Sequence, residues 1–124
     1  MKYSKQRESI LNYVKSVKTH PTAEIIYQEV RKQDNKISLG TVYRNLEKLY
    51  QNGDIKRLKM ANEKDRFDGD ISHHYHGICT KCGKLIDIFV DYYENIDRYI
   101  NKKTNFEVVS HDVIFNVICP ECKN

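Results

Sequence analysis

Apolar residues in the first 60 positions recur at the three-to-four-residue spacing of helices. Ile10, Val14 and Val17 form the first such set, which predicts a helix ahead of the polar break at residues 20–22. Because proline is favoured at the first position of a helix, a second helix is predicted to begin at Pro21. The apolar face of this second helix consists of Ala23, Ile26, Tyr27 and Val30.

A third helix is predicted between Ser38, a favoured N-cap residue, and Gly53, a favoured C-cap residue. Two short strands around a turn follow, over residues 55–60 and 64–67. Three helices followed by a hairpin is the order of a winged helix, a variant of the helix-turn-helix. The third helix has a narrow apolar stripe made of Leu39, Val42, Leu46 and Leu49.

The second half of the chain alternates apolar and polar residues and is rich in β-branched side chains. Strands are predicted over residues 75–79, 84–90 and 108–118, and a helix over residues 92–100. A unit of about 50 residues is near the lower limit for stability without a metal or a partner. In the predicted helix the residues expected to face inward are Tyr93, Ile96 and Ile100.

These patterns predict an α+β protein with two domains. Residues 1–69 would form a winged-helix DNA-binding domain and residues 70–124 a smaller α/β domain. The chain has 124 residues, of which 40% are hydrophobic and 31% charged, as in soluble proteins. Apolar runs such as residues 113–115 are too short to span a membrane, and the N-terminus lacks the apolar core of a signal peptide. The expected location is therefore the cytoplasm.

The net charge of +4 is unevenly distributed along the chain. Residues 1–60 hold 13 Lys and Arg against six Asp and Glu, a net charge of +7. Residues 61–124 hold eight against 11, a net charge of −3. A basic first half is suited to a phosphate backbone, although an ordinary solvated surface has the same composition.

The third helix carries polar residues opposite its apolar stripe. At 100° per residue, Arg44 lies directly opposite the stripe, where it can reach a guanine edge or a phosphate. Tyr43 lies on a flank and could contact DNA or belong to the core, and the whole face could be merely solvated. Lys5 and Arg7, placed ahead of the first helix, could contact the backbone or minor groove. The predicted DNA-contacting residues of the third helix are Gly40, Thr41, Tyr43, Arg44, Asn45 and Lys48.

Four cysteines occur as two C-x-x-C pairs. Cys79 and Cys82 form the first pair, and Cys119 and Cys122 form the second, each at the end of a predicted strand. Two such turns can supply four thiolates in a tetrahedron, the closed geometry of structural zinc. Two disulfides or an iron–sulfur cluster are the alternatives. With no position open to substrate, such a zinc would hold the small second domain together rather than catalyse a reaction.

A second set of metal ligands surrounds a histidine pair. His74 and His76 are two residues apart on a predicted strand, so their imidazoles point to the same face. Asp68 precedes them and Asp87 lies on the next predicted strand, while His20 stands at the break before the second helix. Imidazole and carboxylate ligands suit iron(II) or manganese(II). Each histidine taken alone could equally be an ordinary surface or core residue.

These motifs together resemble the ferric uptake regulator (Fur) family over nearly the whole chain. The resemblance implies a homodimer with an N-terminal winged helix that binds a double-stranded DNA operator, and a C-terminal dimerisation domain. It also implies one structural Zn²⁺ per chain and one regulatory Fe²⁺ or Mn²⁺. The matching segments are His20-Pro21-Thr22-Ala23, Thr41-Val42-Tyr43-Arg44-Asn45-Leu46, Arg66-Phe67-Asp68, His74-Tyr75-His76-Gly77-Ile78-Cys79, Cys82-Gly83-Lys84 and Cys119-x-x-Cys122.

The regulatory metal site of the family corresponds to His20, Asp68, His74, His76 and Asp87 in this chain. Iron sensors of the family tend to have glutamate where this chain has its two aspartates. For that reason the chain most resembles the peroxide-stress repressor branch. In that branch, iron(II) and hydrogen peroxide would oxidise a ligand histidine, and the repressor would leave DNA. An iron(II)- or manganese(II)-sensing repressor is the alternative.

Some family members have a further metal site. Its positions correspond to His73, Tyr75, Glu94 and His111, and Tyr75 stands where a carboxylate is usual, so this site is not predicted here.

Two other classes of protein remain at this point. A zinc metalloenzyme such as a deaminase would require H-x-E, whereas this chain has H-x-H, and it has no recognisable nucleophile and base. A zinc-stabilised interaction module would lack DNA binding.

Overall fold

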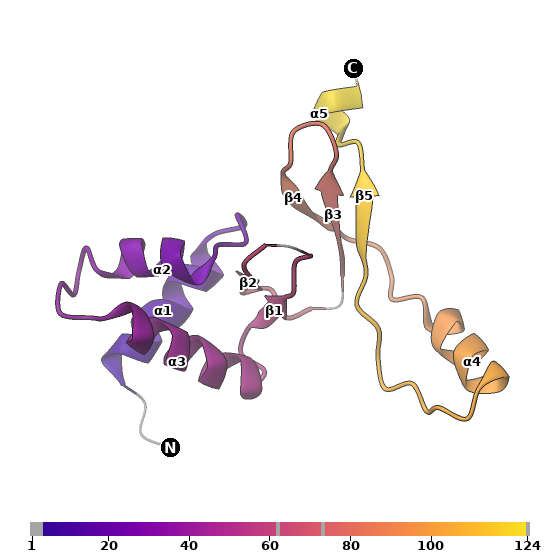
Figure 1. Ribbon diagram of the computed structural model, residues 1–124, viewed down its shortest axis with the longest axis horizontal. Helices are drawn as coiled ribbons and strands as arrows, with labels where there is room; N and C mark the ends of the chain where they lie inside the picture. Colours follow the sequence, from indigo (N-terminus) through magenta and orange to yellow (C-terminus); the bar gives the residue numbers. More distant parts are fainter. Residues whose placement is uncertain (1–3, 62, 73, 124) are drawn as a thin grey trace. The chain divides into compact units, whose positions relative to one another are not determined.

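The structure is a computed structural model that describes residues 4–61, 63–72 and 74–123. It divides the chain into two compact units, Met1–Ile71 and Ser72–Asn124, drawn in Figure 1. The division falls two residues after the boundary placed from the sequence. Helices and strands occur in both units, which confirms the predicted α+β class.

Unit 1 begins with three helices, α1 (Lys5–Ser16), α2 (Ala23–Val30) and α3 (Leu39–Gln51). Each helix follows a residue whose side-chain hydroxyl accepts a hydrogen bond from a backbone N–H of the first turn. These N-caps are Ser4, Thr22 and Ser38.

The prediction that the second helix begins at Pro21 is wrong by two residues. Thr22 is the N-cap, since its hydroxyl accepts the Ile25 N–H at 3.3 Å. The Pro21 carbonyl instead accepts the Phe67 N–H at 3.0 Å, which holds Pro21 outside the helix. The predicted start of α3 after Ser38 is confirmed, and Gly53 lies just beyond its end with φ +80, a conformation that favours glycine.

The wing is an antiparallel pair of strands, β1 (Lys56–Leu58) and β2 (Arg66–Asp68), with Arg57 opposite Phe67. A bridge from Thr22 to Arg66 joins it to the start of α2. The order of three helices and a hairpin confirms the predicted winged helix.

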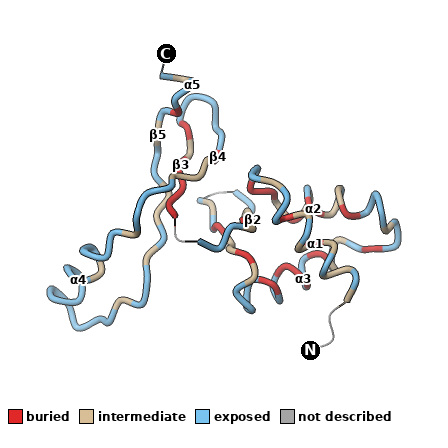
Figure 2. The backbone as a smooth tube through the Cα atoms, turned by 180° about the vertical axis from the view of Figure 1, so that it is seen from behind, coloured by how far each residue is buried: buried red, intermediate tan, exposed pale blue. Residues whose placement is uncertain are grey.

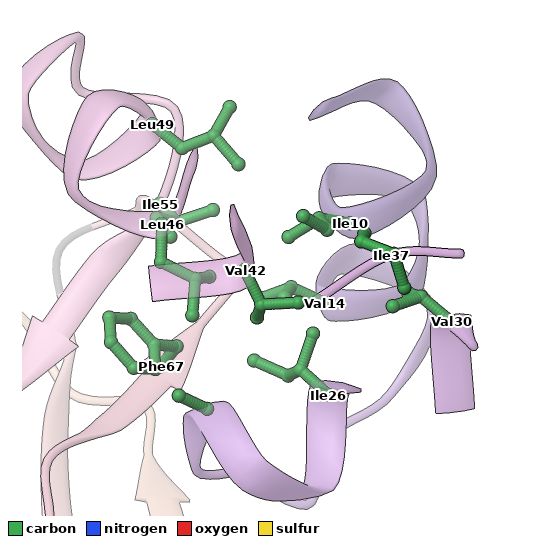
Figure 3. Close-up of a cluster of buried hydrophobic side chains, with 11 residues drawn as sticks. Ile10, Val14, Ile26, Val30, Ile37, Val42, Leu46, Leu49, Ile55 and Phe67 are labelled. Carbon is green, nitrogen blue, oxygen red and sulfur yellow. The ribbon is translucent and has the colours of Figure 1, made fainter. Parts of the chain in front are cut away.

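Unit 1 has a hydrophobic core where its three helices meet the wing (Figure 3). The apolar stripes predicted for the helices supply most of it. Burying each such side chain contributes roughly 1.5–3 kcal/mol relative to exposure. The buried cluster comprises Ile10, Val14, Ala23, Ile26, Val30, Ile37, Val42, Leu46, Leu49, Ile55 and Phe67.

Unit 2 contains a three-stranded sheet in the order β4-β3-β5. Its strands are β3 (Tyr75–Cys79), β4 (Leu85–Ile88) and β5 (Ile114–Val117). β4 is antiparallel to the central strand β3, and β5 is parallel to it. The prediction for residues 75–79 is confirmed, whereas the other two strands are shorter than predicted.

Two helices complete unit 2, α4 (Glu94–Lys103) and the short α5 (Pro120–Lys123). The expectation that Tyr93, Ile96 and Ile100 face inward is wrong, because they are 49%, 45% and 36% exposed. Figure 2 shows α4 as largely exposed, and none of its residues is buried. The apolar stripe is present, but the described part of unit 2 covers it only in part.

Among the described residues, none of the helices is both long and apolar enough to cross a membrane.

Candidate metal centres and nucleic-acid interface

The four cysteine sulfurs converge at one end of the sheet in unit 2. All four thiols are free, and their Sγ atoms lie within 4.8 Å of one another. The Sγ atoms of Cys82 and Cys119 are 3.9 Å apart. Zinc–sulfur bonds of about 2.3 Å in a tetrahedron place sulfurs about 3.8 Å apart. The cluster therefore fits a zinc ion and does not have the geometry of two disulfides.

Strand pairing explains how cysteines 40 residues apart meet. Cys79 ends β3, and in the parallel pair β3–β5 it lies opposite Val117, two residues before Cys119. Gly83, with φ +75, allows the tight turn that follows Cys82. The two C-x-x-C turns are thereby brought together at one end of the sheet.

The thiols of the cluster have opposing tendencies to ionise. Backbone N–H groups of Cys119 and Cys82, each 3.4 Å from Cys79 Sγ, lower the pKa of the Cys79 thiol to about 6. In contrast, side-chain hydrogen bonds with Cys119 and Cys79 raise the pKa of Cys122 to about 12. One thiolate forms readily and the accumulation of further negative charge is opposed. A divalent cation removes that opposition, which agrees with the zinc interpretation.

A second group of ligand atoms lies on β3 and β4 of unit 2. His76 is directly opposite Asp87 in the antiparallel register, and His74 is two residues earlier on the same face of the chain. His74 Nε2 is 3.1 Å from His76 Nε2 and 3.0 Å from Asp87 Oδ1, and His76 Nε2 is 3.2 Å from that oxygen. Ligands at right angles on bonds of about 2.1 Å are about 3.0 Å apart. The three atoms therefore fit one face of a metal's coordination shell.

The orientation of His74 prepares it for this role. Its Nδ1 is 2.8 Å from the Ser72 carbonyl oxygen, which can only accept a hydrogen bond. In the neutral ring the proton therefore resides on Nδ1 and the lone pair on Nε2. A histidine fixed in this way by its second nitrogen is typical of metal ligands.

Unit 1 contributes a separate pair, His20 and Asp68. Both side chains are buried, and His20 Nε2 is 3.5 Å from Asp68 Oδ2. The pair forms because the hydrogen bond from Phe67 N–H to the Pro21 carbonyl places the loop before α2 beside β2. The Asp70 N–H donates to Asp68 Oδ1 at 2.9 Å, which turns the other carboxylate oxygen toward His20.

His20 has an unusual backbone conformation, with φ +54, a value that non-glycine residues rarely adopt. Such strain costs on the order of 1–3 kcal/mol and persists where the surrounding structure holds it, often at functional sites. The conformation adds to the reasons for regarding His20 as a functional residue.

Most residues predicted to contact DNA are accessible on unit 1. Gly40, Arg44, Lys48 and Lys5 are exposed, and Thr41 is partly exposed. Tyr43 is 45% exposed, so its alternative interpretation as a core residue is wrong.

The position predicted for Asn45 requires a correction. Asn45 is buried at 8% exposure, not on an open flank of α3. Its side-chain amide donates to the Thr41 carbonyl at 2.9 Å, and its Oδ1 accepts from Arg7 Nε at 3.0 Å. Both residues therefore form a polar link between α1 and α3, because the apolar stripe is narrow enough for Asn45 to turn toward the neighbouring helix.

Sequence analysis did not identify two cations of the wing, Lys64 and Arg57. Lys64 Nζ is 2.9 Å from Glu24 Oε2, and Arg57 Nη1 is 2.7 Å from Glu47 Oε2. The guanidinium of Arg57 also lies 4.3 Å from the centre of the Tyr50 ring. The sequence feature that could have identified them is the basic composition of the predicted hairpin.

The further metal site known in some relatives is not formed by the described residues. His73 lies outside them. The Nε2 of His111 is 2.7 Å from the Tyr75 hydroxyl, and its Nδ1 is 2.6 Å from Asp97 Oδ1. Both nitrogens of His111 are thus engaged, and the Tyr75 hydroxyl stands where a carboxylate ligand would be needed. The Tyr92 hydroxyl donates to the second oxygen of Asp97 at 2.5 Å and completes the network.

Comparison with known proteins places the chain in a family. A family model described as the ferric uptake regulator family matches residues 1–116. The chain belongs to the ferric uptake regulator family. Members of this family are transcriptional regulators, and a regulatory role for this chain is consistent with that. The chain is a metal-binding regulator of this family, and its four-cysteine cluster fits zinc.

Individual relatives span several kinds of regulator in the family. The peroxide-responsive repressor PerR of Staphylococcus aureus (strain USA300) is 37% identical over 119 residues, which cover 96% of this chain and 80% of the relative. The structure of Helicobacter pylori Fur, described as having three functional metal binding sites, matches with a TM-score of 0.79 and 32% identity, covering 100% of this chain and 83% of that one. The Campylobacter jejuni peroxide stress regulator matches with a TM-score of 0.74 and 29% identity, covering 94% and 88%.

Proposed function

We propose that this chain is a metal-dependent repressor that binds a double-stranded DNA operator as a homodimer and responds to hydrogen peroxide. The observation that carries the proposal is the convergence of His74, His76 and Asp87 on one point, with atoms 3.0–3.2 Å apart. Imidazole and carboxylate donors in this combination suit iron(II) and manganese(II) better than a thiolate site does.

The regulatory ion would be held by five residues, one ion per chain. His74, His76 and Asp87 come from unit 2, and His20 and Asp68 come from unit 1, where they already form a buried pair. Ligands contributed by both units would make the presentation of the winged helix depend on the ion. The protein would then exchange between a DNA-binding arrangement of its two units and an arrangement that does not bind DNA. To shift this equilibrium from almost entirely the second to almost entirely the first, the ion must bind the first more tightly by about 5.5 kcal/mol.

The DNA interface in this proposal is the exposed face of α3, with Gly40, Thr41, Tyr43, Arg44 and Lys48, together with Lys5. An α-helix in the major groove reads base edges, and Arg44 is suited to guanine or phosphate. The basic first half of the chain supports this assignment. Such a regulator acts where the DNA is, so the cytoplasm is the expected location.

Homodimer formation would involve unit 2. Its exposed large hydrophobic side chains include Tyr93, Ile96, Tyr99 and Phe106, which is 75% exposed. Apolar patches of this kind mark protein–protein contacts in soluble proteins. A twofold dimer would also present two winged helices to two half-sites of one operator. One Zn²⁺ per chain, bound by the four cysteines, would hold this unit together.

Peroxide sensing is supported by the PerR relatives at 37% identity and by the two aspartates among the ligands. Iron(II) at this site would supply the reducing electron that activates hydrogen peroxide. The residues that this chain offers to oxidation are the imidazoles of His20 and His74. An oxidised imidazole is a poorer ligand, so the site would lose its ion and the protein would leave DNA. The alternative, an iron(II)- or manganese(II)-sensing repressor, is favoured by the similarity to Helicobacter pylori Fur at a TM-score of 0.79.

The first experiment measures metal-dependent DNA binding. Duplexes are selected from a random pool with the manganese(II) form, and their gel shift is measured with and without manganese(II) or iron(II) in the absence of oxygen. We expect His20→Ala to abolish the metal dependence while zinc content and circular dichroism stay unchanged. His111→Ala is the matched control, since it removes a histidine outside the ligand set. Equal metal dependence in the His20 variant and the wild type contradicts the five-ligand site.

The second experiment separates peroxide sensing from metal sensing. The iron(II) form is treated with a stoichiometric amount of hydrogen peroxide and digested with trypsin, with the manganese(II) form as control. The peptide of residues 19–31 contains His20 and no Met or Cys, so an added oxygen there identifies histidine or tyrosine, which fragmentation distinguishes. The peptide of residues 67–81 contains His74 and also Cys79, which is alkylated first. Absence of added oxygen on both histidines favours the metal-sensing alternative.

A further inference from the structure

One carboxylate in unit 1 joins three elements of the winged helix. Glu24, in the first turn of α2, accepts a hydrogen bond from the Tyr43 hydroxyl of α3, with 2.6 Å between oxygens. The same Oε2 atom accepts from Lys64 Nζ of the wing at 2.9 Å. Consistent with these contacts, hydrogen bonds from Tyr43 and Lys64 lower the pKa of Glu24, and the bond to Glu24 raises the pKa of Tyr43. These three side chains are called the Glu24 latch below.

The latch bridges a place where α3 and the wing are not in full contact. A hollow of about 190 Å³ lies between them, and its lining includes Tyr43, Leu46, Arg57 and Lys64. Leu46 of α3 and Phe67 of β2 line this hollow and also belong to the buried core, so apolar packing joins helix and wing there while polar side chains bridge the hollow itself. Besides the latch, the pair Arg57–Glu47 at 2.7 Å provides such a bridge.

The ion pair of the latch contributes little to the stability of unit 1. Exposed ion pairs contribute little to stability, and Lys64 is 68% exposed. The other oxygen of the carboxylate, Glu24 Oε1, is shielded from solvent and has no hydrogen-bond partner among the described residues. A negative charge beside a face that would meet phosphates opposes binding to any DNA backbone, so its presence there calls for a role in recognition.

We infer that Glu24 is a specificity-determining positioning residue for DNA recognition, which holds Tyr43 of the reading helix and Lys64 of the wing in fixed positions. This inference rests on the proposed DNA-binding function. A phenol whose hydroxyl donates to Glu24 cannot also donate to a phosphate, so Tyr43 presents its ring in one orientation. Lys64, a flexible side chain, is likewise held in one place. A carboxylate that engages both groups also makes them less available to an arbitrary phosphate backbone.

The test compares Glu24→Ala with the matched variant Glu47→Ala. Each removes one negative charge and one bridge to the wing, but only the first releases Tyr43. The probes are a duplex selected by the wild-type manganese(II) form and a scrambled duplex of the same composition. We expect both variants to bind the scrambled duplex severalfold more tightly than wild type, since a repulsive charge is gone. Only Glu24→Ala should lower the ratio of the affinity for the selected duplex to that for the scrambled duplex. The expected decrease is about tenfold, similar to the effect of one mismatched base pair in a binding site.

Two further variants define the mechanism. The double variant Tyr43→Phe/Glu24→Ala should lower the affinity ratio no more than the more severe of the two single variants. The effects should not add, because both substitutions remove the same hydrogen bond and release the same ring. Glu24→Gln should restore part of the ratio, since an amide oxygen still accepts from the phenol. Equal ratios in Glu24→Ala and Glu47→Ala, or additive effects in the double variant, overturn the inference.

A measurement without DNA separates this inference from the proposed function. In the free protein with ¹³C-labelled tyrosine, the pKa of the Tyr43 phenol should fall in Glu24→Ala and stay unchanged in Glu47→Ala. If the pKa falls as expected but the wild type prefers neither duplex, the proposed function fails and the role in specificity fails with it. If the wild type prefers the selected duplex but the pKa of Tyr43 is the same in Glu24→Ala, the proposed function stands and only the role of the Glu24 latch is wrong.

Discussion

Units 1 and 2 reach stability in different ways. Unit 1 buries 11 hydrophobic residues in one cluster that joins three helices and the wing. In unit 2 the buried side chains are few and lie around the two candidate metal sites, among them Cys79, Cys119, His74 and His76. Along α4 and the loop after it the chain is almost entirely exposed (Figure 2). A unit with its own core is expected to fold by itself, whereas unit 2 is expected to depend on the proposed zinc ion and dimer partner.

Zinc removal should produce the largest difference between the units. Structural zinc sites provide on the order of 10–16 kcal/mol of apparent binding energy, which is also folding energy. Cys119→Ser, or a strong chelator, should therefore unfold unit 2 and leave unit 1 folded. Amide hydrogen exchange resolved by segment measures this. Ser110→Ala, a polar change on the exposed surface of unit 2, is the control. Equal loss of protection in both units would contradict the comparison.

Truncation of an apolar side chain should have different consequences in the two units. Leu46→Ala opens a cavity in the core of unit 1 and should lower the free energy of unfolding by about 2–5 kcal/mol, whatever the protein concentration. Ile96→Ala removes a side chain that is 45% exposed, so it should act on dimer formation. Its melting temperature should then depend less steeply on protein concentration than that of the wild type, because a weaker dimer adds less stability as concentration rises. Thermal unfolding over a hundredfold range of concentration measures both, and a concentration-independent loss in Ile96→Ala speaks against a dimer contact there.

Two glycines offer a smaller comparison. A Cβ at Gly69 would lie 2.6 Å from Lys15 Cα and 2.8 Å from the Val14 carbonyl oxygen, which are backbone atoms that cannot move aside. A Cβ at Gly77 would lie 2.9 Å from Ile88 Cδ1, the end of a flexible side chain. Gly69→Ala should therefore cost roughly 3 kcal/mol in unit 1 and Gly77→Ala about 1 kcal/mol in unit 2. Denaturant unfolding followed separately in each unit measures the two losses of stability. A larger loss for Gly77→Ala than for Gly69→Ala would show that unit 2 is the more tightly packed.

The smallest expected effect concerns pH and unit 2. Hydrogen bonds from the Tyr92 hydroxyl and from His111 lower the pKa of Asp97 below its ordinary value of 3.8. Because the folded pKa is lowered, this contribution to stability is complete above pH 4 and is lost as the pH falls through the lowered value. Protection of α4 amides should decline in that range in the wild type. In Asp97→Asn it should be weaker throughout and independent of pH there, and an unchanged acid profile would remove Asp97 as the cause.

Sequence patterns predicted unit 1 closely because its signals are local. Helical spacing and the N-cap Ser38 placed α3, and the order of elements indicated the winged helix. The start of α2 was misplaced because the proline rule competed with a stronger side-chain cap at Thr22. Unit 2 was predicted less well, since β5 is parallel to β3 and its pairing partner lies almost 40 residues away.

The chemistry of this protein was largely determined by residue type and spacing. Two C-x-x-C pairs indicated a tetrathiolate site, and H-x-H on a strand indicated a shared ion, because these spacings specify one face or one turn. Tertiary structure alone decided which distant side chains meet. It placed Asp87 opposite His76 and engaged both nitrogens of His111. It also buried Asn45 and joined Glu24 to Tyr43 and Lys64, since contacts across elements depend on packing and register that no local pattern encodes.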